Sequence, residues 1–384
     1  MDFELTEEQQ ALAEMAAGLS RRRAPNPNVA PEQAGEFPWE FAHELADHDL
    51  TGIDIPAEKG GQGLSLLDSI LVLSAVARTA PHLGDAVQAT NFGAIRQVAA
   101  FAGERLIADV LAPALAGRAL ITVGMTEPGG GSALGGLRTR ARRTGDTIVV
   151  DGSKVFNSQG PEATHCVVWS RFGDETDSIG AVVVPTDTAG FSRGATEHYM
   201  SGEAHCTLSF ERCEVPAEYM LLKGDGMRRM MPVFNIERLG NAARSHAFGE
   251  LALRLATEHM LERETGGGRL ADYQGLRWKL AEMRLRLDAA GLLLHRAALQ
   301  LSDGIPDPLN TSLAKLAANE AGFHAANEAL QIFGGYGFTE DSPLNYLFKR
   351  TRGWMIAGGS VEMQRNRIAS EMLRHKTAQS GRGR

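Results

Sequence analysis

The order in which helix-forming and strand-forming segments follow one another most constrains the fold of this chain. Thr6, with Gln9 three positions later, is typical of a capping box at the start of a helix. Apolar residues recur at helical spacing after it, and other segments of this kind follow. We predict further helices near residues 38–49, 66–79, 84–100 and 103–116.

The middle third changes character. Segments 147–151, 166–170 and 179–185 are short, rich in β-branched residues and bounded by Gly, Asp or Pro, which is typical of strands. Asp151-Gly152 lies between two apolar runs and predicts a tight hairpin turn at that point. These segments predict a small β domain.

The last third returns to long helices, because residues near 226–262, 272–303 and 307–333 are rich in Ala, Leu, Arg and Glu. Long helices joined by short loops favour an antiparallel bundle. The whole chain is therefore predicted to be an α+β multidomain protein.

Composition excludes several classes of function. The chain has 39 basic and 47 acidic residues, and a net charge of −8 argues against a nucleic-acid partner. No apolar run approaches the ~20 residues that span a membrane. Cys166, Cys206 and Cys213 lack the spacing of metal ligands, and an odd, sparse set suits a reducing compartment. The start MDFELTEEQQ lacks a secretion signal pattern, so we expect a cytoplasmic protein without a bound metal.

The strongest local signal is TEPGGGS at residues 126–132, which follows an apolar run. A Gly-rich turn lets backbone N–H groups approach a flat or anionic ligand closely. The turn is not a P-loop, because no Gly-Lys-Ser/Thr follows, and its spacing does not match GxGxxG. Taken alone, such a turn is more often structural than functional.

Four other motifs are weak when each is taken alone. KVFNSQG at 154–160 could stack Phe156 on a ring, although a Phe there is more often core. QIFGGYG at 331–337 could be only a helix end. GGSVEMQR at 358–365 opens a helix, whose free N–H groups can bind an anion. FNIERLG at 234–240 places Phe234 and Glu237 on one helix face, where a lone Glu is usually solvated.

In this order and spacing, the motifs together resemble those of the acyl-CoA dehydrogenase family. TEPGGGS, DGSKVFNSQG, QIFGGYGF, GGSVEMQR and the N-terminal IPAEKGGQGLSLLD each match a family segment, and the resemblance runs from about residue 2 to 375. It implies an N-terminal α-helical domain (1–119), a middle β-barrel or β-sandwich domain (120–223) and a C-terminal four-helix bundle (224–384). It also implies FAD between the last two domains, an acyl-CoA substrate and a homotetramer.

The resemblance also assigns residues to the cofactor and the substrate. Positions that match the family's flavin contacts are Met125, Thr126, Gly131, Ser132, Phe156 and Ser158. Positions that match its nucleotide end are Gln331, Gly335, Ser360 and Glu362, with Arg263 reaching the cofactor of a neighbouring subunit. Positions that match its acyl-CoA contacts are Ser132, Phe234, Asn235 and Arg238.

The family's reaction needs a base for the α proton, hydrogen bonds for the developing enolate oxygen, and a flavin for the β hydride. Most members carry the base at the position of Gly358, which has no side chain here. Isovaleryl-type and long-chain-type members carry it on the long helix, directly before the position of Arg238. We therefore expect Glu237 to be the base, and the Gly358 backbone N–H to bind the thioester oxygen. A buried Glu has a pKa raised toward the working pH.

Departures from the family pattern leave alternatives open. Residues 265–267 replace a segment that normally supplies an aromatic residue to FAD, and residues 200–205 depart from a motif before the CoA-side strand. The leading hypothesis is a dehydrogenase that passes electrons to an electron-transfer flavoprotein. The alternatives are an acyl-carrier-protein thioester as substrate, another flavin reaction such as oxidation by oxygen or desulfination, and a subunit of a heteromer.

Overall fold

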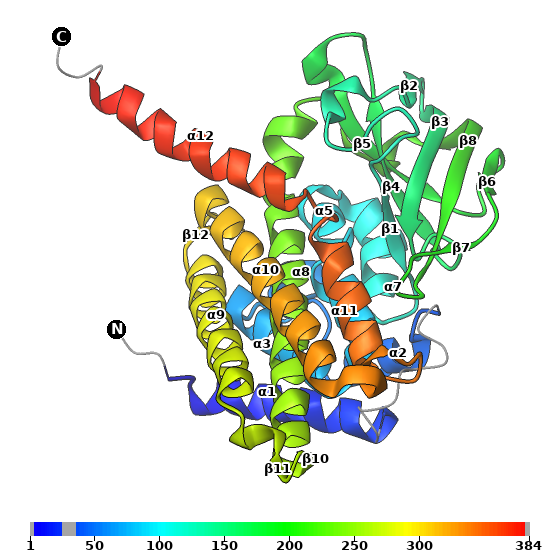
Figure 1. Ribbon diagram of the computed structural model, residues 1–384. Helices are drawn as coiled ribbons and strands as arrows, with labels where there is room; N and C mark the ends of the chain where they lie inside the picture. The colour runs from blue at the N-terminus through cyan, green and yellow to red at the C-terminus, as the bar shows by residue number, and fades with distance from the viewer. Residues whose placement is uncertain (1–3, 25–35, 381–384) are drawn as a thin grey trace. The chain divides into compact units, whose positions relative to one another are not determined.

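The computed structural model describes residues 4–24 and 36–380, which fall into two compact units (Figure 1). One unit is helical and comprises the described residues of 1–31, 70–84 and 238–384. The other contains the sheet and comprises those of 32–69 and 85–237. The boundaries of the three predicted domains stay a prediction.

The helical unit is organised around helix α10 (Pro308–Phe333), which contacts α9 (Gln274–Leu299), α11 (Pro343–Trp354) and α12 (Val361–Ser380). Figure 1 shows these helices in yellow to red. The unit also contains α1 (Glu7–Arg23), most of α3 (Leu66–Thr79), and α8 (Gly226–Glu262) from residue 238 onward. The capping box predicted at Thr6 and Gln9 is confirmed.

Helices α8 and α10 approach each other at two glycines. A Cβ atom on Gly249 would lie 2.9 Å from the Cα of Gly322. A Cβ atom on Gly322 would lie 2.2 Å from the backbone oxygen of Ser245. No side chain larger than hydrogen fits between the two backbones, so these glycines set how closely the helices pack.

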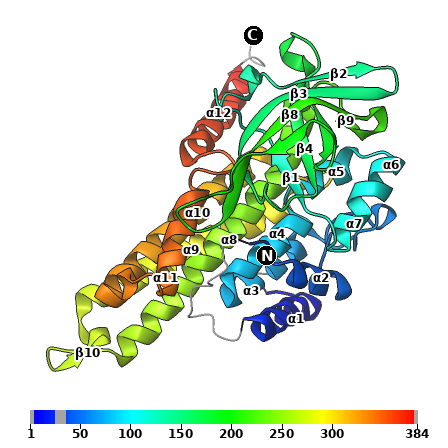
Figure 2. The same cartoon turned by 90° about the vertical axis from the view of Figure 1, so that its right-hand side faces the viewer.

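The sheet unit holds nine strands in the order β6-β8-β3-β2-β4-β5-β9, with β1 parallel to β4 and β7 antiparallel to β8 (Figure 2). The strands are β1 (Ile121–Gly124), β2 (Arg140–Thr144), β3 (Thr147–Ser158), β4 (His165–Arg171), β5 (Ile179–Pro185), β6 (Phe191–Arg193), β7 (Glu197–His198), β8 (Ala204–Pro216) and β9 (Met220–Leu222).

The core of this unit joins the sheet to short helical segments. Its helices are α2 (Trp39–Asp47), α4 (Gly84–Asn91), α5 (Ile95–Phe101), α6 (Glu104–Leu106) and α7 (Ala112–Leu115). Side chains of α5, α6 and α7 pack with β4, β5 and β8 in one buried apolar cluster. Trp169 is fully buried in it and donates from Nε1 to Gln97 Oε1 at 3.0 Å. The satisfied indole N–H lets the ring lie in the core without a desolvation cost.

One sequence prediction is wrong. The chain does not turn at Asp151-Gly152, because β3 runs straight through these residues with only a register shift beside them. The hairpin turn lies earlier, between β2 and β3, where Thr144 pairs with Thr147. Strand β2 has the sequence RARRT and buries only Ala141, so it lacks the alternating apolar pattern that would have revealed it.

The other elements agree with the predicted order. The helix expected near 84–100 divides into α4 and α5, and α8 ends at Glu262, one residue before Arg263. The α+β architecture of helices, sheet and helices is confirmed. Across residues 4–24 and 36–380, we find no helix that is both long and apolar enough to cross a membrane.

The close approach of α8 and α10 can be tested at Gly322. Gly322→Ala forces a methyl group against the backbone of Ser245 and should destabilise the protein by about 1–3 kcal/mol. Gly18→Ala is the matched control, because nothing lies within 4 Å of a Cβ atom on Gly18 in α1. It should stabilise by about 0.5–1 kcal/mol. Thermal unfolding midpoints measure both effects, and equal midpoints would contradict the packing described.

Candidate active site

The Gly-rich turn after β1 is closed on itself and presents its tip to solvent. The Glu127 N–H donates to the Gly130 oxygen at 3.2 Å, and the Gly130 N–H donates back to the Glu127 oxygen at 3.0 Å. Residues 128–133 are exposed, and nothing lies within 4 Å of a Cβ atom on Gly129 or Gly130. A ligand can therefore reach the backbone at this tip without a clash.

A buried ion pair fixes the base of this turn. Glu127 Oε1 lies 2.7 Å from Lys154 Nζ, and the side chains are 8% and 0% exposed. The Glu127 carboxylate also accepts the backbone N–H groups of Arg138 and Thr139, at 2.6 and 2.9 Å. Burial alone would raise the pKa of Glu127, but the hydrogen bonds from Lys154 and Thr139 outweigh it and lower that pKa to about 2.

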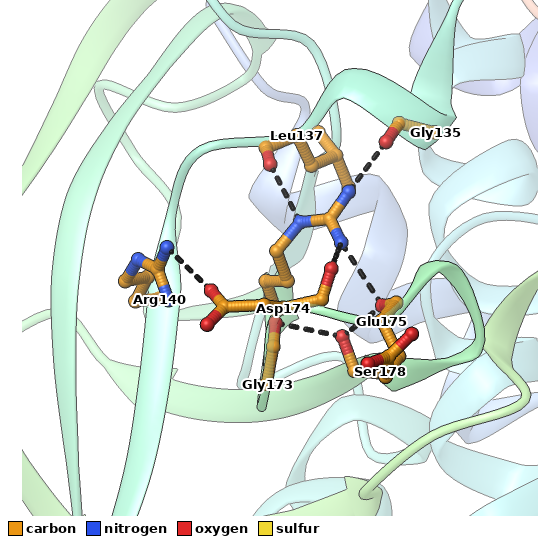
Figure 3. Close-up of polar contacts among 8 residues, drawn as sticks. Gly135, Leu137, Arg140, Gly173, Asp174, Glu175 and Ser178 are labelled. Atoms are coloured by element: carbon orange, nitrogen blue, oxygen red, sulfur yellow. Dashed lines mark hydrogen bonds and ion pairs between the residues drawn. The ribbon is translucent and has the colours of Figure 1, made fainter.

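Arg171 holds the segment that follows the turn, and Figure 3 labels the residues that its guanidinium contacts, Gly135, Leu137, Asp174 and Glu175. Its guanidinium donates to the backbone oxygens of Gly135 and Leu137 on one side, and to those of Asp174 and Glu175 on the other. A planar group with five N–H donors suits this role, because it can bind several carbonyls at fixed angles. Residues 134–139 are therefore anchored, and the tip is the part of the turn left open.

The end of β3 lies against the same turn. The Val155 N–H donates to the Thr126 oxygen at 2.9 Å, and Thr122 Oγ1 donates to the Ser158 oxygen at 3.0 Å. A register shift between Lys154 and Asn157 accompanies a positive φ of 56° at Phe156. This bulge leaves Phe156 62% exposed.

The structure thus brings together the predicted flavin contacts of the sheet unit: Met125, Thr126, Gly131, Ser132, Phe156 and Ser158. They combine an exposed aromatic ring, exposed hydroxyls and an open stretch of backbone. This donor set fits a flat, polar-edged ring such as that of FAD. When bound, FAD supplies an acceptor for hydride, which no protein side chain provides.

In the helical unit, residues 358–360 form a tight loop before α12. Arg238 Nε donates to the Gly358 oxygen at 3.0 Å. Gly358 has φ +68°, and a Cβ atom there would lie 3.0 Å from Asn241 Nδ2. Ser360 lies at the start of α12, where its side chain accepts the Met363 N–H at 3.5 Å. The Ser360 side chain also lowers the pKa of Glu362 through a hydrogen bond.

The remaining nucleotide-end residues lie at the other end of the helical unit. Gln331 and Gly335 are exposed at the end of α10, and Arg263 lies over the Tyr336 ring, 5.8 Å from its centroid. The structure therefore places Arg263 beside the 331–337 segment. Gly266 and Gly267 form the turn of a hairpin between β10 (Glu264–Thr265) and β11 (Gly268–Arg269), where the Tyr273 hydroxyl donates to the Thr265 oxygen.

The predicted base and substrate residues lie together on α8. Phe234 and Asn235 are buried, and Glu237 is half-buried. Glu237 directly precedes Arg238, the residue that binds the Gly358 carbonyl. Their roles in binding and proton transfer stay predictions.

Sequence reasoning missed several residues that hold the site. Lys154 and Glu127 stand inside quoted motifs, yet nothing in the sequence pairs two charges separated by 27 positions. Arg171 lies outside the motifs, and so does Tyr199, whose hydroxyl contacts Ser158 Oγ at 3.2 Å. The atypical residues at 200–205 were the one sign in the sequence that the loop containing Tyr199 differs from the family pattern.

Comparisons with known proteins agree with this architecture. Family models match as the acyl-CoA dehydrogenase N-terminal domain at 6–118, the middle domain at 122–213 and the C-terminal domain at 224–373. Benzylmalonyl-CoA dehydrogenase of Aromatoleum aromaticum is 30% identical, over 97% of this chain and 100% of that protein. A 3-sulfinopropanoyl-CoA desulfinase of Advenella mimigardefordensis is 29% identical, over 99% and 97%.

Solved structures agree as well. Butyryl-CoA dehydrogenase of Megasphaera elsdenii matches with a TM-score of 0.89 and 28% identity, over 97% of this chain and 100% of that one. A chain in a structure described as electron transferring flavoprotein of Acidaminococcus fermentans matches with a TM-score of 0.90 and 29% identity, over the same shares. The chain belongs to the acyl-CoA dehydrogenase family, whose members are FAD-dependent oxidoreductases that act on CH–CH groups.

The buried pair at the base of the turn predicts a pH-dependent contribution to stability. Because the pKa of Glu127 is lowered from 4.5 to about 2, its contribution is complete above about pH 4.5 and is lost as the pH falls toward 2. Glu127→Gln should cost about 3 kcal/mol at pH 7, since it removes the counter-charge of buried Lys154. The difference in the free energy of unfolding between the wild type and Glu127→Gln should become smaller below pH 4.5.

Unfolding midpoints between pH 3 and 7 measure this effect. Glu258→Gln is the control, because Glu258 pairs with Arg254 at the surface, where such pairs contribute about 0.5 kcal/mol or less. A difference between wild type and Glu127→Gln that stays constant over this range would show that the carboxylate charge is not what stabilises the turn.

Proposed function

We propose that this protein removes hydrogen from the α and β carbons of an acyl-CoA thioester, with Glu237 as the base that takes the α proton. The observation that carries the proposal is the exchange of residues at two positions. The resemblance matches Gly358 to the position where most members carry the base. Glu237 directly precedes Arg238, whose Nε donates to the Gly358 oxygen at 3.0 Å.

The backbone at Gly358 argues against an acid there in this chain. Its φ of +68° lies in the left-handed region, which side chains rarely adopt, and a Cβ atom would crowd Asn241 Nδ2 at 3.0 Å. A carboxylate on α8 avoids both problems, since Glu237 extends from a regular helix. Glu237 is half-buried on this helix, so its carboxylate is partly shielded from water.

The other groups have supporting roles in this proposal. The Gly358 N–H donates to the thioester oxygen, where negative charge develops. Phe234, Asn235, Arg238 and Ser132 bind the acyl-CoA, and the residues around the Gly-rich turn hold the flavin ring. Ser360 and Glu362 hold its nucleotide end. Gln331, Gly335 and Arg263, at the other end of the helical unit, hold the nucleotide end of the cofactor of a neighbouring subunit. Electrons leave to an electron-transfer flavoprotein, in line with the neighbour described under that name.

Glu237→Gln should separate binding from chemistry. Gln has nearly the same shape but cannot accept the proton, so bleaching of the flavin by an acyl-CoA should slow by at least about 10²-fold. FAD should stay bound, as its absorbance reports. Anaerobic mixing with a panel of acyl-CoA thioesters measures this rate and identifies the preferred acyl group.

Glu250→Gln is the matched control on the same helix, because Glu250 pairs with Arg78 away from the motif. It should bleach at the wild-type rate. Full-rate bleaching by Glu237→Gln would remove Glu237 from the base role, whereas a wild-type protein that binds no FAD would contradict the proposed activity as a whole.

A second candidate is desulfination of a sulfinoacyl-CoA, which needs no conventional base. The desulfinase of Advenella mimigardefordensis, 29% identical over 99% of this chain, favours it, as does the missing side chain at Gly358. A reaction with 3-sulfinopropanoyl-CoA as substrate distinguishes dehydrogenation from desulfination. Release of sulfite without flavin bleaching, at a rate unaffected by Glu237→Gln, would favour desulfination.

We also propose that the protein is a homotetramer in the cytoplasm, where three buried, unpaired cysteines would stay reduced. Helix α9 supports self-association. Trp278, Leu285, Leu292 and Leu299 recur every seven residues along it and are 65%, 66%, 52% and 65% exposed. Such a stripe lies on one helix face, and a large exposed apolar surface marks a binding interface. A homologous partner chain is the alternative occupant.

Charges placed on this stripe should dissociate the assembly. Leu285→Glu combined with Leu292→Glu puts like charges on apolar positions that pack between subunits, so the mass in light scattering should fall. Met15→Glu, at a residue 40% exposed on α1, is the control and should keep the wild-type mass. An unchanged mass in the double variant would show that α9 is not the interface.

A further inference from the structure

A loop from outside the family motifs converges on the exposed end of β3. Tyr199 lies between β7 and β8, and its backbone is held by a hydrogen bond from its N–H to the Glu203 oxygen at 3.0 Å. Its hydroxyl reaches across to β3, where it contacts Ser158 Oγ at 3.2 Å and the Phe156 backbone oxygen at 3.1 Å. These two β3 residues are the ones expected to face the flavin ring.

His205 fixes the direction of this tyrosine. The Tyr199 and His205 rings stack with centroids 4.2 Å apart and planes 29° apart, and the centroid of the Phe156 ring lies 5.7 Å from that of His205. His205 is 6% exposed and lies opposite Ser158 in the β3–β8 pairing. Burial lowers the pKa of His205, so a neutral ring supports the stack. The tyrosine ring is thus held between a buried partner and two β3 contacts.

The two contacts of the hydroxyl decide which atom donates. A tyrosine hydroxyl has one hydrogen, and a backbone carbonyl can only accept. The Tyr199 hydrogen is therefore directed to the Phe156 oxygen, and the contact with Ser158 can only be made by the Ser158 hydrogen pointing to the Tyr199 oxygen. Ser158 is exposed, so its outward side then offers lone pairs and no hydrogen.

We propose that Tyr199 is a positioning residue that makes Ser158 a hydrogen-bond acceptor toward the flavin and so favours the reduced cofactor. This inference rests on the proposed function, because it requires FAD at Ser158. The ring nitrogen that takes up hydride is an acceptor when oxidised and carries an N–H when reduced. With FAD bound so that Ser158 faces this nitrogen, an acceptor-only Ser158 would pair with the reduced form and would have no hydrogen for the oxidised one.

Tyr199→Phe tests the direction of the hydrogen bond between Tyr199 and Ser158, because it removes the hydroxyl but keeps the ring that stacks on His205. The variant frees the Ser158 hydrogen to donate to the oxidised ring, so the equilibrium should shift toward oxidised flavin by about tenfold. That shift corresponds to a midpoint potential about 30 mV lower for a two-electron couple. Spectroelectrochemical titration of the purified, FAD-loaded protein measures it without substrate.

Ser158→Ala shows whether Tyr199 acts through Ser158. Removing the hydroxyl loses the acceptor but adds no donor, so the potential should fall by less than in Tyr199→Phe. Adding Tyr199→Phe to Ser158→Ala should then change nothing further. Tyr219→Phe is the matched control, because it removes a hydroxyl that donates to Asp109 Oδ2 at 2.8 Å, and it should keep the wild-type potential.

The outcomes separate the inference from the proposed function. A wild-type protein that binds no FAD would overturn both. FAD binding and bleaching by an acyl-CoA, with an unchanged potential in Tyr199→Phe, would overturn the inference and leave the function standing. If Tyr199→Phe lowers the midpoint potential by the same amount in the wild type and in the Ser158→Ala variant, the result would show a general structural effect that does not act through Ser158. It would overturn the inference.

Discussion

The buried ion pair between Glu127 and Lys154 is the interaction on which the sheet-unit site depends. It joins two segments that each carry flavin-contact candidates, the Gly-rich turn and the end of β3. Neither charge is stable there alone, because a charge removed from water needs a partner and further hydrogen bonds. The carboxylate obtains these from two backbone N–H groups. The pair therefore fixes the register between turn and strand, and leaves the turn tip and the Phe156 ring exposed.

The order of helices and strands and the positions of the motifs could be predicted from the sequence, because both depend on local patterns of residues. Long amphipathic helices and β-branched strands such as β5 have clear periodicity, so their bounds agree with the structure. Strand β2 does not, because most of its side chains face solvent. Contacts between distant residues were not predictable. Nothing local to Lys154, Arg171 or Tyr199 indicates which carboxylate, carbonyl or hydroxyl it meets.

The resemblance offers two positions for the base, residue 358 and residue 237, and the backbone at Gly358 favours the second. Gly358 has a left-handed backbone and a Cβ atom there would crowd Asn241, so a side chain at this position would be strained, whereas the Gly358 carbonyl accepts from Arg238 Nε. The same loop therefore disfavours a side chain at residue 358 and binds Arg238, the residue next to Glu237. The proposed base, Glu237, lies on a regular helix, where its backbone needs no special conformation.

The direction of the hydrogen bond at Ser158 also depends on a residue far away in the sequence. Ser158 is a predicted flavin contact, but a hydroxyl can donate or accept, and the sequence does not say which. Its polarity follows from Tyr199, 41 residues away, whose single hydrogen is directed to a carbonyl. Tyr199 directly precedes residues 200–205, which depart from a family motif, so a divergent loop would set how the family position at Ser158 interacts. Divergence beside a retained site residue can change the electronic character of the site without changing any residue that touches the cofactor.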